Sequence, residues 1–202
     1  DEYEEWIKAR EDDIASIEDK HMDAALKQID LAKKCLTRMR TGIALIQEND
    51  KVWTAFSFAN KAMLMQQLHY KLPLTEYSGF DTETFEMVLA TDIKLPDFDD
   101  EATWYNPDGK NVYGKWRPFQ IAFILMNLLS MSDKESPERQ IVDLIWFPTG
   151  GGKTEAYLGL TAFTILYRRL NDPADSGTNV IMRYTLRLLA AQQYERAASL
   201  IC

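Results

Sequence analysis

The stretch of sequence that decides the fold is Ile141-Val142-Asp143-Leu144-Ile145-Trp146-Phe147-Pro148-Thr149-Gly150-Gly151-Gly152-Lys153-Thr154. Its first half is a short apolar run of the kind that forms a buried strand. Its second half is rich in glycine and leads into a helix-forming run. A strand, a glycine-rich loop and a helix in this order are typical of a phosphate-binding loop, in which backbone N–H groups and the positive end of the helix dipole face an anion.

This loop predicts a site for ATP and Mg²⁺. In such loops the lysine, here Lys153, reaches the β- and γ-phosphates, and the next hydroxyl, here that of Thr154, ligates Mg²⁺. We predict catalytic roles for these two residues. The residues expected to hold the phosphates are Thr149, Gly150, Gly151, Gly152, Lys153 and Thr154. The strict motif has a glycine six residues before the lysine, where this chain has Phe147. The alternative is a glycine-rich turn that only joins a strand to a helix.

The residues after the loop predict a parallel sheet. Residues 153–170 have the pattern of a helix, and its apolar face consists of Ala156, Leu160, Phe163 and Tyr167. A second β-rich run covers residues 179–184 and precedes a last helix. Strand, helix, strand and helix in succession imply an α/β fold whose parallel strands are joined by right-handed crossovers.

The first half of the chain predicts a helical region. Residues 1–20 are acidic and have helical spacing, and residues 21–47 have the period of a long amphipathic helix. Its apolar seam consists of Met22, Ala25, Ile29, Ala32, Leu36, Met39, Ile43 and Ile46. Residues 51–70 are apolar nearly all round, so a second, largely buried helix is expected to form a hairpin with the first. Residues 71–115 are irregular: we expect a short helix at 82–90 and a solvated acidic loop at 97–101.

Composition limits the class of protein. The chain has 202 residues, 46% of them hydrophobic, and a net charge of −8. The charge is uneven, because residues 1–20 carry a net −6 and residues 148–202 a net +2. A polyanion would therefore bind residues 148–202 and not the acidic N-terminus. Two cysteines do not indicate a disulfide framework, so we expect a reducing, cytoplasmic environment. No apolar run reaches the length of a membrane span.

A polar segment before the loop can contribute to nucleotide binding. Arg117-Pro118-Phe119-Gln120 precedes an apolar run at 121–129, and Pro118 suits the first turn of a helix. A glutamine amide such as that of Gln120 matches the N6 donor and the N7 acceptor of adenine. The alternative is that Arg117 and Gln120 only cap the helix.

These segments, in this order, resemble three motifs of superfamily 2 helicases. Arg117 to Gln120 resembles the adenine-reading motif, Pro148 to Thr154 resembles motif I, and Thr185 to Gln192 resembles motif Ia. The last match is looser, because Leu188 replaces the acid of that family and no proline precedes the segment. The resemblance implies that Arg117 and Gln120 hold adenine. It also implies that Thr185 and Arg187 contact the phosphodiester backbone of DNA, a contact that is tolerant of sequence and sensitive to salt.

A closer resemblance covers most of the chain. Residues 116–125, 146–160 and 182–193, together with the helical segment around residues 58–63, are similar to the helicase subunit of DISARM anti-phage systems. This resemblance implies an ATP-hydrolysing DNA helicase or translocase of bacterial defence, which works with a second, DrmB-like subunit and not with a membrane.

We therefore predict two regions. Residues 1–115 are the helical N-terminal region. Residues 116–202 are the first half of a RecA-like P-loop domain, which ends before the Asp-Glu box. Because phosphoryl transfer needs the carboxylate of that box, we expect residues 1–202 alone not to hydrolyse ATP appreciably. The alternatives are a restriction-system motor subunit, an ATP-binding switch or assembly module, and a helical interaction protein with a vestigial loop.

Overall fold

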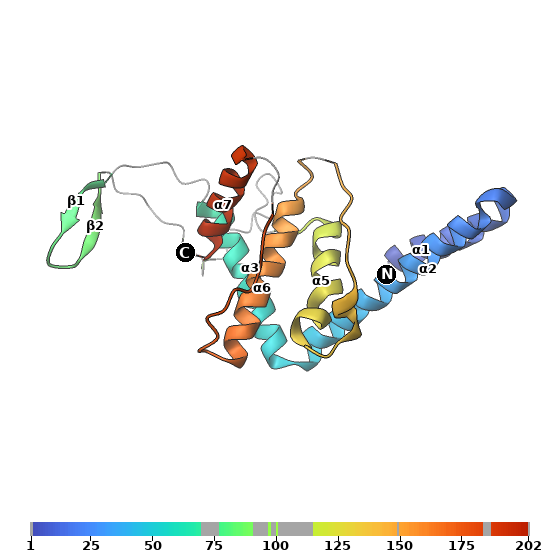
Figure 1. Ribbon diagram of the computed structural model, residues 1–202, viewed down its shortest axis with the longest axis horizontal. Helices are drawn as coiled ribbons and strands as arrows, with labels where there is room; N and C mark the ends of the chain where they lie inside the picture. The colour runs from blue at the N-terminus through green and yellow to red at the C-terminus, as the bar shows by residue number, and fades with distance from the viewer. Residues whose placement is uncertain are drawn as a thin grey trace.

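Helices form most of the structure, a computed structural model that describes residues 2–69, 77–90, 97, 100, 115–148, 150–183 and 187–201 (Figure 1). The α-helices are α1 (Glu2–Asp13), α2 (Asp19–Glu48), α3 (Asp50–His69), α5 (Pro118–Ser132), α6 (Lys153–Asn171) and α7 (Arg187–Ile201). Two 3₁₀ turns, η1 (Ile14–Ser16) and η2 (Pro137–Gln140), and two strands, β1 (Tyr77–Asp81) and β2 (Glu86–Leu89), complete the described elements. The predicted acidic loop at 97–101 lies mostly outside the described residues.

The hydrophobic core lies where α3, α5 and α6 pack together. Its buried residues are Val52, Ala55 and Ala59 of α3, Ile124 and Leu128 of α5, and Ala162 and Phe163 of α6. The core therefore combines side chains from both sides of position 115. The expectation that α3 is buried nearly all round is wrong for Trp53 and Phe58, which are 56% and 52% exposed. These two aromatic side chains lie outside the face of α3 that packs in the core.

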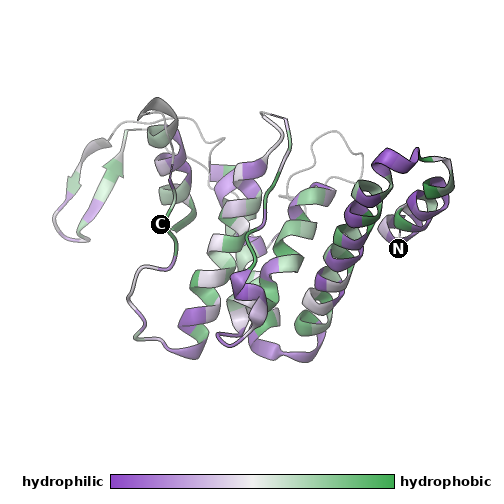
Figure 2. Ribbon diagram, turned by 45° about the vertical axis from the view of Figure 1, so that its right-hand side comes forward, coloured by the Kyte–Doolittle hydropathy of each residue, from purple (hydrophilic) through white to green (hydrophobic). Residues whose placement is uncertain are grey.

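Helices α1 and α2 form an arm that extends from this core (Figure 1). The predicted seam of α2 is confirmed at seven of its eight positions, which are partly buried. Ile43 is the exception, with 44% of its surface exposed. Next to it, Gly42 is buried against α5, where a Cβ atom would lie 2.2 Å from the carbonyl oxygen of Leu125. Gly42 faces α5, and the next residue of a helix points about 100° away from it, so the Ile43 side chain is turned outward. In Figure 2 hydrophilic and hydrophobic residues alternate along α2, whereas α5 is hydrophobic over most of its length.

The predicted helix at residues 82–90 is wrong. Strands β1 and β2 pair in an antiparallel hairpin there, with Phe80 opposite Met87. The carboxylate of Asp81 accepts hydrogen bonds from the N–H groups of Glu83 and Thr84, at 2.8 and 3.1 Å. An acceptor at this position favours a tight turn over a helix. Phe85 closes the turn with a φ of 59°.

No parallel sheet forms among the described residues, whose only sheet is the β1–β2 pair. Both segments that were predicted as strands, residues 141–147 and 179–184, lack strand structure where they are described. The first runs beside α5 with alternate side chains in solvent: Val142 is 94%, Leu144 87% and Trp146 86% exposed. This pattern is that of a strand without a neighbour, because one set of side chains is partly covered and the other set is bare.

Candidate nucleotide site

The glycine-rich loop turns sharply into the N-terminus of α6. Gly150 and Gly152 have positive φ values of 80° and 87°, which residues with side chains rarely adopt. Gly152 is the N-cap residue and Lys153 the first residue of α6. The N–H groups of the first turn of a helix have no partner within the helix, so this end of α6 is suited to an anion.

The ammonium group of Lys153 is held by the loop itself. Its Nζ donates hydrogen bonds to the carbonyl oxygens of Phe147, at 2.6 Å, and Pro148, at 3.2 Å. The N–H of Gly151 donates to the same Pro148 oxygen at 3.1 Å, which closes the loop. An incoming phosphate would compete with these carbonyls for the three N–H donors of the lysine. Thr154 follows Lys153 in the first turn of α6, and Thr149 lies outside the described residues.

Arg117 and Gln120, at the start of α5, contact the loop directly. Arg117 Nη1 donates to the carbonyl oxygen of Gly151 at 2.8 Å, and Gln120 Nε2 donates to that of Gly152 at 2.7 Å. Gln120 Oε1 also accepts the backbone N–H of Arg117, the N-cap residue of α5, at 2.7 Å. The two residues that were assigned to adenine therefore lie next to the residues that were assigned to the phosphates.

Phe147, which stands where the strict motif has a glycine, packs against α5. The Phe147 ring stacks on Phe119 of α5, with centroids 4.2 Å apart and planes at 17°. A Cβ atom on Gly151 would lie 2.3 Å from the Phe147 ring. The large residue at 147 therefore favours a glycine at 151, so the departure from the motif and this one glycine belong together.

Most basic side chains of residues 148–202 bind other groups of the same chain. Arg196 of α7 forms an ion pair with Glu155 in the first turn of α6. Arg168 binds both carboxylate oxygens of Asp175, at 2.6 and 2.8 Å, and holds the pKa of that carboxyl below its ordinary value. Of the two residues assigned to DNA, Thr185 lies outside the described residues and Arg187 is the first residue of α7.

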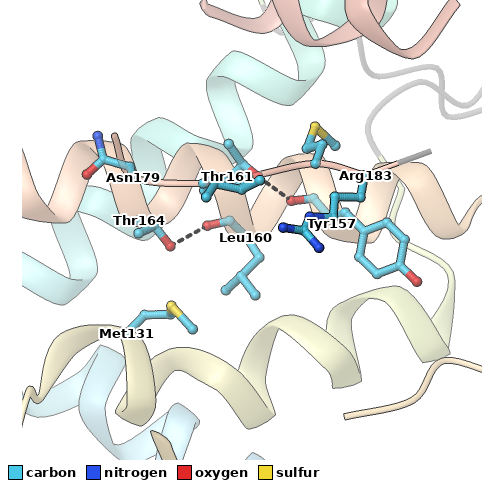
Figure 3. Close-up of a pocket in the computed structure, with 10 residues that line it drawn as sticks. Met131, Tyr157, Leu160, Thr161, Thr164, Asn179 and Arg183 are labelled. Carbon is cyan, nitrogen blue, oxygen red and sulfur yellow. Dashed lines mark hydrogen bonds between the residues drawn. The ribbon is translucent and has the colours of Figure 1, made fainter. Parts of the chain in front are cut away.

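A cavity of about 560 Å³ lies between α6, the end of α5 and the extended segment at residues 179–183 (Figure 3). Figure 3 shows Tyr157, Leu160, Thr161 and Thr164 of α6 facing Met131 of α5 and the extended segment that carries Asn179 and Arg183. The two threonine hydroxyls donate to carbonyls of their own helix, so only their acceptor lone pairs are left for a ligand. None of the predicted nucleotide residues lines this cavity.

Two further properties bear on the class of site. Within the described part of the chain, no group of three or more His, Cys, Asp or Glu side chains could hold a metal ion. A Mg²⁺ ion that is bound through Thr154 would fit this, because Mg²⁺ in nucleotide sites takes few protein ligands and is completed by phosphates and water. In the same described residues, no helix is both long and apolar enough to cross a membrane.

The structure defines a helix-rich protein with a glycine-rich, lysine-containing loop at the N-terminus of a helix. Over 208 aligned residues, which include 98% of the chain, it is 40% identical to the DISARM protein DrmA of Bacillus paralicheniformis (strain ATCC 9945a / NCIMB 11709 / CD-2). The chain therefore belongs to the DrmA-like DISARM proteins. It spans only 16% of the length of that relative. No protein-family model matches the chain.

Proposed function

We propose that the chain carries the ATP site of a superfamily 2 DNA helicase or translocase in a DISARM anti-phage system. The observation that carries this proposal is the loop at the start of α6, where two glycines have positive φ values and Lys153 is the first helical residue. In the complete domain, residues 141–147 and 179–184 would be strands of a RecA-like parallel sheet. A DrmB-like subunit is the proposed protein partner, and DNA the proposed polymer.

The charges and hydrogen bonds of the loop suggest how ATP would be held. Lys153 would exchange its bonds to the Phe147 and Pro148 carbonyls for bonds to the β- and γ-phosphates. Thr154 would contribute its hydroxyl to Mg²⁺, which neutralises charge on the transferring phosphoryl group. Gln120 keeps one N–H and one lone pair beyond its bonds within the chain, and these are the two groups that adenine requires.

The proposed contacts to DNA come from the segment that precedes and begins α7. Thr185 and Arg187 would bind phosphates of the backbone, so affinity should fall as salt rises and should vary little with sequence. The net charge of +2 over residues 148–202 supports this placement. The pairing of Arg168 and Arg196 with carboxylates leaves less charge for DNA than the count of bases suggests.

The first prediction concerns Lys153. In the intact protein, Lys153→Ala should lower ATP hydrolysis roughly hundredfold or more, because the substitution removes a charge that stabilises the transition state. Single-stranded DNA should raise the turnover of the wild type. Lys51→Ala is the matched control: Lys51 bonds to Asn171 at the opposite end of α6, at 2.9 Å, and its loss should leave turnover unchanged.

Steady-state ATPase assays with and without DNA distinguish the alternatives. Equal turnover by Lys153→Ala and wild type would contradict the proposed ATP site. Turnover that depends on Lys153 but ignores DNA would contradict the translocase and favour an ATP-binding switch or assembly module.

A further inference from the structure

Arg38 of the arm binds the segment that leads into the glycine-rich loop. It lies in α2 with only 9% of its surface exposed. Its Nη1 and Nη2 atoms donate to the two carboxylate oxygens of Asp143, at 2.6 and 2.8 Å. Its Nε atom donates to Glu138 of η2 at 3.2 Å. One guanidinium thus joins α2 to two points of the connection between α5 and the loop.

Asp143 is close to the loop along an extended chain. The segment from Asp143 leads to Phe147 and Pro148, whose carbonyl oxygens bind Lys153. Within the described structure no β-ladder holds this segment in place. Side-chain contacts hold it instead: the Arg38–Asp143 pair lies at one end, and the Phe119–Phe147 stack and the bond from Lys153 lie at the other.

We propose that Arg38 is a positioning residue for the nucleotide site: it holds the segment before the loop so that the loop and Lys153 lie where ATP can bind. This inference rests on the proposed ATP site and adds a residue of the N-terminal arm to it. Asp143 and Glu138 are the partners through which Arg38 acts.

The chemistry of the contact suits this role. A guanidinium is planar, so two parallel bonds to one carboxylate fix the orientation of both groups, and the third donor fixes a second carboxylate. The hydrogen bonds to Asp143 hold the pKa of the Arg38 guanidinium above its ordinary value, so the group is charged at any physiological pH. Without it, two carboxylates that are 18% and 19% exposed would face each other with no counter-charge, and the segment would have to move.

The test is the affinity of the intact protein for a fluorescent ATP analogue, measured per folded molecule. Arg38→Met should weaken binding by about tenfold or more, since small displacements of binding groups are costly. The affinity of Arg38→Lys should lie between those of the wild type and Arg38→Met, because an ammonium supplies the charge but not the two parallel N–H donors of a guanidinium. Arg168→Met is the matched control, because it removes another Arg–Asp pair with two hydrogen bonds, made by Nε and Nη2 of Arg168 to Asp175 near the end of α6 that is opposite the loop. This variant should bind the analogue as the wild type does.

Each outcome bears on a different claim. Equal affinity of wild type and Arg38→Met, even with a lower melting temperature, would make Arg38 a purely structural residue and overturn the inference while the ATP site stands. A wild type that does not bind the analogue would overturn the proposed function and the inference with it. If Arg38→Met does not fold, Arg38→Lys takes its place, and wild-type affinity in that variant overturns the inference.

Discussion

Two roles converge on the side chain of Gln120. The residue is 4% exposed, and both of its amide atoms already bond within the chain. One role is to hold the loop through the Gly152 carbonyl, and the other is to read adenine with the remaining donor and acceptor. The loop-holding bond is present in the structure, whereas adenine reading remains a prediction.

Base selectivity separates these roles. If Gln120 reads adenine, Gln120→Ala should weaken ATP binding by roughly tenfold or more and should weaken GTP binding much less, because guanine presents a different edge. If it only holds the loop, both nucleotides should lose affinity equally. Competition binding of ATP and GTP measures the ratio. Gln66→Ala is the control, because Gln66 is also buried and donates to a backbone carbonyl, that of Arg196, at 2.7 Å.

Whether the sequence could predict a contact of the site depended on how far apart the two residues lie along the chain. The Gly150 to Lys153 pattern is local, and its turn into α6 is confirmed. Asp143 is absent from the predicted site, because its partner Arg38 is 105 residues away in the chain. A lone carboxylate in an apolar run was the available signal, since a partly buried charge requires a partner.

Among the elements, the contact of α2 with α5 depends on one glycine. At Gly42 a Cβ atom would lie 2.2 Å from the Leu125 oxygen, and a backbone atom of a helix cannot rotate away. Gly42→Ala should lower the free energy of unfolding by about 2 kcal/mol, because the overpacking outweighs the gain in helix propensity. Urea unfolding followed by circular dichroism measures the change.

The hairpin provides the control for this prediction. Gly79 of β1 has no atom within 4 Å of an added Cβ, so Gly79→Ala should change stability by less than about 0.5 kcal/mol. Wild-type stability in Gly42→Ala would mean that α2 can shift on α5 without loss, and the close contact would then be unimportant.

Helices were predictable here and strands were not, for a physical reason. The seam of α2 repeats within one element, so the sequence alone contains it. The hairpin at residues 77–89 depends on the Asp81 carboxylate, whose bonds to Glu83 and Thr84 turn the chain where helical spacing suggested a helix. A strand needs a neighbour, and the described residues supply none to residues 141–147.

At the scale of the whole molecule, the core joins the helical region to the loop-bearing region. Val52, Ala55 and Ala59 of α3 pack with Ile124 and Phe163 in one cluster. Of the predicted fold class, the described residues confirm the helices but not the parallel sheet, which stays part of the proposed function.

This shared core predicts that residues 116–202 do not fold alone. Without α3, the core faces of α5 and α6 would be open to water, and roughly 1.5–3 kcal/mol of burial would be lost for each large side chain. Residues 116–202 should show no cooperative thermal transition by circular dichroism, whereas residues 1–202 should show one. A cooperative transition in the shorter polypeptide would indicate that the loop-bearing region is an independent unit.

The bare face of residues 141–147 has a consequence for handling this polypeptide. Val142, Leu144 and Trp146 alternate along an extended chain that has no sheet partner in the described structure. Such an edge is a template for another copy of itself, so purified residues 1–202 should aggregate as concentration rises. Soluble preparations would then require a lysine or proline in that segment, or the co-expression of whatever chain pairs with it.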